Sequence, residues 1–291
     1  ALINAQGLSI SLFPGLVDTR GQVAETSEKV FGAKVPITAI VADQQCALVA
    51  HGDLTASACK MTYGTSGVFN LSTGQSLEMP DATIVPWIQS RIMDETTYCI
   101  EGMVTSAGAM FDWLVSGLKA TSAVSELSDF ATTVPNTQGV SVLPALWGLG
   151  APHGKSDVTG KINGLSAGVT NAHIVRAAFE GVAFRVKEIV DVVDQAKLMP
   201  GISDRPLPVD GGASQIDVFL QIQANVLQRP VKRHAVSEAT AFGAALSAGL
   251  GVSKLEKNQL QTFAKYDRTF IPEWSQDYAE EAFSTWKQSV F

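Results

Sequence analysis

Residues 40–69 read IVADQQCALVAHGDLTASACKMTYGTSGVF, and this stretch decides the fold. It continues an apolar, β-branched run at residues 37–41, which predicts a buried strand that ends at Asp43, Gln44 and Gln45. An acid and two amides at the end of a strand are typical of functional sites in α/β sheets. Asp43 also fits a helix N-cap, because an amphiphilic segment follows it. The two interpretations are compatible, since a helix N-terminus keeps a carboxylate ionised.

Two glycine-containing loops are candidate anion sites. Residues 62–67, TYGTSG, form a turn between two apolar runs, and residues 210–213, DGGA, lie between a predicted strand and a predicted helix at residues 215–227. Glycines let the backbone approach an anion, and N–H groups and hydroxyls supply donors. An ordinary hairpin or a tight turn has the same composition. Two such loops together with the Asp43 carboxylate nevertheless predict phosphoryl transfer to an alcohol.

Gly108 follows a predicted strand at residues 97–105 and precedes a predicted helix at residues 109–118. A glycine there allows either a flat ligand ring or a neighbouring helix to approach the backbone, and the spacing slightly favours helix packing.

The rest of the chain alternates strands and helices, which predicts an α/β fold. Apolar residues recur at helical spacing at residues 171–196, and further helices are expected at residues 237–249 and 276–290. The alternation has no linker from residue 36 onwards. We therefore expect one domain at residues 36–291, with residues 1–35 as a lead-in segment.

Composition excludes several classes of protein. A chain of 291 residues with 46% hydrophobic and 17% charged residues is typical of a globular protein. Its net charge of −7 argues against nucleic acid or an anionic membrane as a partner. The chain has three cysteines, Cys46, Cys59 and Cys99, and they show no CxxC spacing. We therefore expect neither a disulfide framework nor a zinc site, and we expect a cytoplasmic location. The chain begins without Met in mid-pattern, so we expect it to be a piece of a longer protein.

Taken together, these motifs resemble the C-terminal half of the FGGY carbohydrate kinases, and within them the glycerol kinases. Residues 43–48, DQQCAL, resemble the family's GDQQxAL motif, and residues 60–67 resemble its K-x-TYGTG phosphate loop. Residues 160–165 and 173–180 resemble the second family signature, and residues 210–213 and 238–245 resemble the DGGA and ETTALGAA segments. The combination is specific and covers nearly the whole chain.

The resemblance implies an actin-like, ribonuclease-H-like domain that is the C-terminal half of a two-domain sugar kinase with ATP between its domains. It implies ATP and Mg²⁺ as cofactors and a missing N-terminal domain with a DxGT-type loop, and it leaves a homo-oligomer open. It also implies roles for individual residues. Asp43 would be the base for the substrate hydroxyl and a metal ligand, and Gln44 would hold the substrate. The implied nucleotide-binding residues are Gly64, Thr65, Gly108, Gly212 and Ile216.

Four residues depart from the family pattern. Val68 replaces an aromatic residue next to the substrate, Gly154 and Thr159 replace Trp and Arg, and Ile216 replaces an Asn near the adenosine. The expected function is ATP-dependent phosphorylation of a small polyol or sugar, with this chain inactive alone. The alternatives are a kinase of another sugar such as a pentulose, or a non-catalytic nucleotide-binding module on the same fold. An actin-type or chaperone-type ATPase is disfavoured by the DQQ motif.

Overall fold

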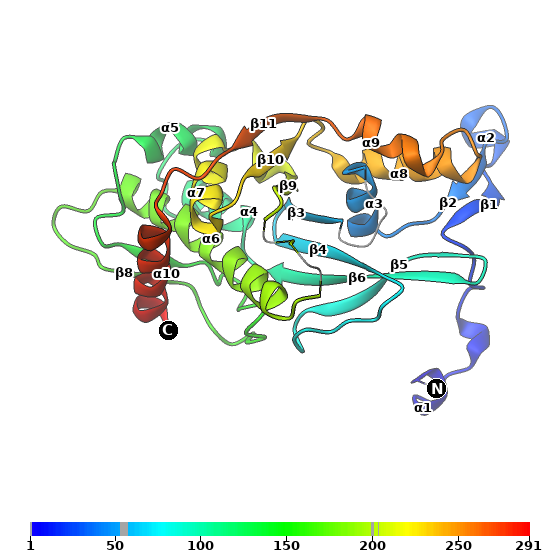
Figure 1. Cartoon of the computed structure of the whole chain (residues 1–291), viewed down its shortest axis with the longest axis horizontal. Helices are drawn as coiled ribbons and strands as arrows, with labels where there is room; N and C mark the ends of the chain where they lie inside the picture. The colour runs from blue at the N-terminus through cyan, green and yellow to red at the C-terminus, as the bar shows by residue number, and fades with distance from the viewer. Residues whose placement is uncertain (1, 53–57, 199–200, 203) are drawn as a thin grey trace.

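The computed structural model describes residues 2–52, 58–198, 201–202 and 204–291. A seven-stranded sheet with the order β11-β10-β9-β3-β4-β6-β5 forms its centre (Figure 1). Its strands are β3 (Cys59–Tyr63), β4 (Gly67–Gly74), β5 (Val85–Ile92), β6 (Glu95–Val104), β9 (Leu207–Asp210), β10 (Val231–His234) and β11 (Tyr266–Phe270). Two-stranded sheets are formed by β1 (Arg20–Glu25) with β2 (Pro36–Ala39), and by β7 (Ser141–Leu143) with β8 (Lys161–Asn163).

Helices cover the sheet, and none in the described parts of the chain is long and apolar enough to cross a membrane. The helices are α1 (Leu2–Ala5), α2 (Glu28–Phe31), α3 (Asp43–Ala50), α4 (Gly108–Ser116), α5 (Leu127–Thr132), α6 (Asn171–Gln195), α7 (Asp217–Leu227), α8 (Ala239–Gly251), α9 (Leu260–Phe263) and α10 (Gln276–Val290). Short 3₁₀ turns connect several elements, and the one that matters for the site is η3 (Gly212–Gln215).

The strand directions bring the two glycine loops together. β3 runs parallel to β9, with Thr62 opposite Asp210, and antiparallel to β4. Parallel strands end at the same edge of a sheet. The loop at residues 64–66, which follows β3, therefore lies beside the loop at residues 211–212, which follows β9.

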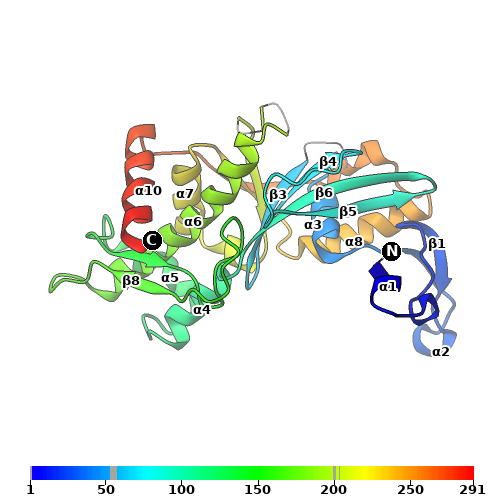
Figure 2. The same ribbon diagram turned by 90° about the horizontal axis from the view of Figure 1, so that it is seen from below.

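The two faces of the sheet differ in polarity. One set of alternate side chains is apolar and packs toward α6 and α7, where the ring centroids of Tyr63 and Phe219 are 4.9 Å apart. The other set is polar and faces α3, whose Gln44 contacts Lys60. Figure 2 shows α3 and α8 on one side of the sheet and α6, α7 and α10 on the other. On β3 and β4 the apolar set includes Met61, Tyr63, Phe69 and Leu71, and the polar set includes Lys60, Thr62, Asn70 and Ser72.

Helix α6 lies at the centre of the apolar core and confirms the helical periodicity of the sequence. It spans 25 residues and ends one residue before its predicted end. The Thr170 N–H donates to His173 Nδ1 over 3.1 Å, so His173 helps to cap the start of the helix. The ring of Phe179 meets that of Phe111 edge-on at 4.8 Å.

Helices α3 and α8 pack with their backbones in contact. A Cβ atom added to Gly243 of α8 would lie 1.7 Å from the carbonyl oxygen of Cys46 in α3. Only glycine fits there, and the alanine- and glycine-rich sequence of α8 suits this close packing.

The prediction of a buried strand before Asp43 is wrong. The strand that forms is β2, and among the described residues it pairs only with β1, at one end of the molecule (Figure 1). Ile37 is 37% exposed and Ile40 is 58% exposed. β1 lies before position 35 and β2 lies after it, and the two strands pair with each other. The division of the chain into a lead-in segment, residues 1–35, and a domain, residues 36–291, stays a prediction.

Several helix starts also differ from expectation, and α8 begins at Ala239, two residues after its predicted start. Asp43 is the first residue of α3 and Ala42 is its N-cap, so Asp43 is not the cap. The predicted helix at residues 215–227 begins at Asp217, because η3 and an extended Ile216 come first. The strands β5, β8, β10 and β11 are not predicted by the sequence patterns, since charged residues or proline interrupt their alternation.

Candidate active site

A cavity of about 280 Å³ opens where β3 and β9 end. Four of the predicted nucleotide-binding residues line it, namely Gly64, Thr65, Gly108 and Gly212. Its remaining lining residues are Tyr63, Phe111, Asp112, Val124 and Ala213. The cavity therefore joins the two glycine loops to the start of α4.

The loop after β3 is held by the start of α4. The N–H of Gly108 donates to the carbonyl oxygen of Gly64 over 3.0 Å, and the N–H of Ala109 donates to that of Thr65 over 3.0 Å. A Cβ atom on Gly108 would lie 2.4 Å from the Gly64 oxygen. Gly108 thus allows close packing, as its spacing suggests, and lines the cavity as well.

The two glycines after β9 have different surroundings. Gly211 has a φ of +90°, and a Cβ atom there would lie 2.5 Å from the carbonyl oxygen of Tyr63. Gly212 has no such neighbour within 4 Å. Gly211 therefore shapes the turn, whereas Gly212 borders open space in the cavity.

Ile216 does not join this group. Its side chain is 5% exposed and belongs to the main hydrophobic core, and it does not line the cavity. Phe111 and Val124 do line the cavity, but the sequence does not single them out. The position of Phe111 three residues after Gly108 is the one local signal that points to it.

Asp43 and Gln44 lie at the start of α3, on the polar face of the sheet. The Asp43 side chain is exposed, and its Oδ1 accepts a hydrogen bond from the Gln44 N–H over 2.8 Å. Gln44 is half-buried, and its Oε1 accepts a hydrogen bond from Lys60 Nζ. The amide of Gln44 is therefore tied to β3, the strand that leads into the phosphate-loop candidate, and Asp43 directly precedes it in α3.

Lys60 lies beside this pair, and the sequence gives it no role beyond its place in a motif. Its side chain is 0% exposed, and its Nζ also donates to Thr62 Oγ1 over 2.6 Å. Burial lowers the pKa of the Lys60 ammonium to about 8, while the carboxylates of Asp210, Glu101 and Asp43 act to raise it. At neutral pH the group is protonated and has only donors to offer.

Asp210, at the end of β9, is the buried partner of His51. The Nε2 of His51 lies 2.7 Å from Asp210 Oδ2. Burial raises the pKa of the Asp210 carboxyl, but the His51 hydrogen bond and the Lys60 charge outweigh it and lower the pKa below its usual value. Burial lowers the pKa of His51. The pair is therefore a neutral imidazole that donates to an ionised carboxylate.

Residues 59–252 match the FGGY family of carbohydrate kinases, C-terminal domain. The chain belongs to this family.

Individual relatives agree with the family assignment. The chain is 34% identical to a glycerol kinase of Acinetobacter baylyi over 290 residues, and 37% identical to one of Acaryochloris marina over 294 residues. Each comparison covers 99% of this chain and 58% of the relative. The chain thus spans less than two thirds of the length of these curated relatives.

Solved structures show the same fold. A glycerol kinase of Plasmodium falciparum, solved with ADP, superposes with a TM-score of 0.84 at 27% identity, over 96% of this chain and 56% of that one. A xylulose kinase of Rhodospirillum rubrum superposes with a TM-score of 0.80 at 22% identity, over 99% of this chain and 58% of that one. The fold is the C-terminal, actin-like domain of the FGGY sugar kinases.

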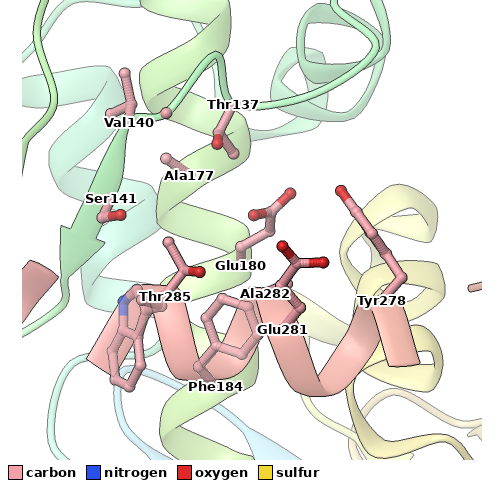
Figure 3. Close-up of a pocket in the computed structure, with 12 residues that line it drawn as sticks. Thr137, Val140, Ser141, Ala177, Glu180, Phe184, Tyr278, Glu281, Ala282 and Thr285 are labelled. Atoms are coloured by element: carbon pink, nitrogen blue, oxygen red, sulfur yellow. The ribbon is translucent and has the colours of Figure 1, made fainter. Parts of the chain in front are cut away.

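A second cavity of about 230 Å³ lies between α6, α10 and the segment before β7 (Figure 3). Glu180 and Glu281 extend into it, and Phe184 forms part of its wall. Burial raises the pKa of Glu180 to about 7, against the opposing effect of Arg176, whose Nε is 3.5 Å from Glu180 Oε1.

Proposed function

We propose that this chain is the C-terminal, nucleotide-binding domain of an enzyme that uses ATP to phosphorylate a hydroxyl of a small polyol or sugar. One observation carries the proposal. β3 connects Gly64 and Thr65, at the cavity, to Lys60, which is hydrogen-bonded to Gln44 beside Asp43. A single strand thus links a candidate phosphate site to an acid and an amide suited to an alcohol.

The nucleotide would bind at the cavity where β3 and β9 end. Gly64, Thr65 and Gly212 would place backbone N–H groups and a hydroxyl near the phosphates, as glycine loops do at anion sites. Gly108 and Phe111 would border the rest of the ligand. The ADP in the Plasmodium glycerol kinase structure supports an adenine nucleotide. Ile216 is left out of this site, because its side chain lies in the core.

Asp43 would act as the base. The acceptor hydroxyl oxygen would attack the γ-phosphorus, the bond to the β,γ-bridging oxygen would break, and ADP would leave with that oxygen. The hydroxyl proton would pass to the Asp43 carboxylate. Its exposure makes it accessible to a substrate, and such a base typically contributes a factor of about 10² to 10⁴. The remaining acceleration would come from alignment and charge stabilisation.

Mg²⁺ fits this arrangement through a single carboxylate. Within the described residues no three His, Cys, Asp or Glu side chains converge on one point. Mg²⁺ is commonly held by one or two carboxylates together with substrate phosphates, and Asp43 offers one exposed carboxylate. When bound, the ion would neutralise phosphate charge.

The remaining donors would come from another domain. Because the chain covers 58% of its glycerol kinase relatives, we propose that a domain with a DxGT-type loop precedes residues 1–35 in the full protein. Most of the acceptor pocket would lie on that domain. Val68 is buried opposite Thr62 on β4 and is smaller than an aromatic residue, so an acceptor other than glycerol, such as a pentulose, is the second candidate.

The test is steady-state phosphorylation by the full-length protein with Mg²⁺ and ATP, using glycerol, erythritol and several ketoses. We expect ADP to form in step with one phosphorylated acceptor. ATP binding without transfer to any of these acceptors would contradict the proposal and would favour a non-catalytic nucleotide-binding module.

A further inference from the structure

We propose that Lys60 is a positioning residue that fixes the amide of Gln44 with its oxygen inward and its NH₂ group toward the acceptor. This inference rests on the proposed function. It assigns to Lys60 a role in directing the proton of the acceptor hydroxyl toward Asp43.

The orientation follows from hydrogen-bond chemistry. A lysine ammonium has three donors and no acceptor. The Gln44 atom that faces Lys60 Nζ must therefore be the oxygen, which is how the two groups meet. Nε2 of Gln44 then points away from Lys60, and among the described residues it donates to no protein group.

Lys60 is itself held in one place. It is fully buried on β3, and Thr62 Oγ1 accepts a second hydrogen bond from Nζ over 2.6 Å. Glu101 and Asp210 supply opposing charge from the strands β6 and β9. Glu101 is anchored in turn, because Asn70 Nδ2 donates to its Oε2 over 3.0 Å. A buried cation with these partners cannot turn away without leaving charge unpaired.

The consequence concerns the proton of the acceptor. A hydroxyl has one donor and two acceptor lone pairs. If Gln44 presents N–H groups, the hydroxyl oxygen accepts from Gln44, and its single proton stays free for Asp43. If Gln44 presented its oxygen, the hydroxyl would donate to the amide, and its proton would point away from the base. Lys60 would thus enforce the productive arrangement without touching the substrate.

The experiment is a double-mutant cycle in the full-length protein with its best acceptor, using Lys60→Met, Gln44→Ala and the double variant. We expect Lys60→Met to raise the KM of the acceptor or lower kcat/KM by about tenfold, the size of one lost hydrogen bond, with the ATP Kd unchanged. In the Gln44→Ala background the Lys60→Met change should have almost no further effect, because Lys60 acts through the Gln44 amide, which is already absent there. Lys187→Met is the matched control, since it removes a lysine paired with Asp191 outside the site, and it should match the wild type.

Gln44→Glu tests the same point without removing the buried lysine. Glutamate keeps an oxygen for Lys60 but has no N–H to present. It should keep the thermal stability of the wild type and lose acceptor affinity about tenfold. Wild-type acceptor kinetics in Gln44→Glu, or equal losses from Lys60→Met in both backgrounds, would overturn this inference alone. A wild-type protein that phosphorylates no acceptor would overturn the proposed function and this inference with it.

Discussion

Single glycines around the cavity divide into those that the fold requires and those that leave space for a ligand. Gly108 and Gly211 have backbone atoms where a side chain would begin, whereas Gly212 has none within 4 Å. Substitution to alanine therefore separates stability from binding at these positions.

We expect Gly108→Ala to destabilise the fold by roughly 1–3 kcal/mol, because the loop at Gly64 must move to admit the methyl group. Gly212→Ala should change stability by less than about 0.5 kcal/mol. It should nevertheless weaken ATP binding by about tenfold, since its methyl group enters the space assigned to the nucleotide. Urea unfolding and ATP titration of the full-length protein measure both. Wild-type ATP affinity in Gly212→Ala would remove Gly212 from the nucleotide site.

Glu180 gives a pH-dependent prediction. Burial raises its pKa to about 7 in the folded protein, above its ordinary value. Between about pH 4.5 and 7 the unfolded chain gives up this proton while the folded chain keeps it, so wild-type stability falls as the pH rises through that window. The Glu180→Gln variant has no carboxyl group at this position, so its stability does not fall with pH for this reason. Because the side chain is 16% exposed, we expect the variant to gain roughly 1–3 kcal/mol relative to the wild type between pH 4 and 8. Urea unfolding at several pH values measures this, and a difference that does not change with pH would contradict it.

Sequence patterns predict those site residues whose chemistry is local. Gly64, Thr65, Gly108 and Gly212 can be proposed from the sequence because each lies in a short motif beside a predicted strand or helix, and the structure places all four at one cavity. Lys60 cannot be assigned a role in this way, because its partner Gln44 lies 16 positions away. That contact depends on which face of β3 meets α3, and the sequence does not state it.

At the scale of elements, the contact between α3 and α8 determines where Asp43 and Gln44 lie. α3 has eight residues, and its first residue is Asp43. Helices this short are not stable alone, so α8 must hold α3 in place. The carbonyl of Cys46 rests against Gly243, which allows the two backbones to approach.

We predict that Gly243→Ala lowers stability by about 3 kcal/mol or more, because the new Cβ atom meets backbone that cannot turn aside. Turnover should fall as well, since α3 carries the acid. Ala245→Ser, at an exposed position of α8, is the control and should stay within about 0.5 kcal/mol of the wild type. Thermal unfolding and steady-state assays of both variants decide the matter, and a stable, fully active Gly243→Ala protein would show that this contact does not position the acid.

Elements with strong periodicity could be predicted from the sequence, and several short strands could not. The apolar spacing of α6 and α10 gives their extents to within a residue. β10 and β11 could not be predicted because they contain charged side chains, which interrupt the apolar alternation of a strand. These side chains pair between the two strands, as Arg233 does with Asp267 at 2.9 Å. The exposure of β2 could not be predicted either, since an apolar strand is expected to be covered by something within the same chain.

At the scale of the whole molecule, the account depends on a second domain. The cavity, the acid and the amide described above all belong to this chain, but it spans 58% of the curated relatives that it matches. A site between two domains has only part of its donors on each of them.

We therefore predict that residues 1–291 alone bind ATP at least about tenfold more weakly than the full-length protein, and phosphorylate no acceptor. Isothermal titration and a coupled ADP assay on both proteins provide the comparison. Phosphorylation of any polyol by the isolated chain would show that the second domain is not needed for the chemistry.

The central claim is that Asp43 is the base of a phosphoryl transfer, and Asp43→Asn in the full-length protein tests it most directly. Asparagine keeps the oxygen that accepts the Gln44 N–H, so thermal stability and ATP affinity should stay near those of the wild type. It loses the charge that takes the hydroxyl proton, which is worth a factor of about 10² to 10⁴. The account predicts a fall in kcat of at least about a hundredfold with the ATP Kd unchanged. A variant that keeps more than about a tenth of wild-type turnover would contradict it.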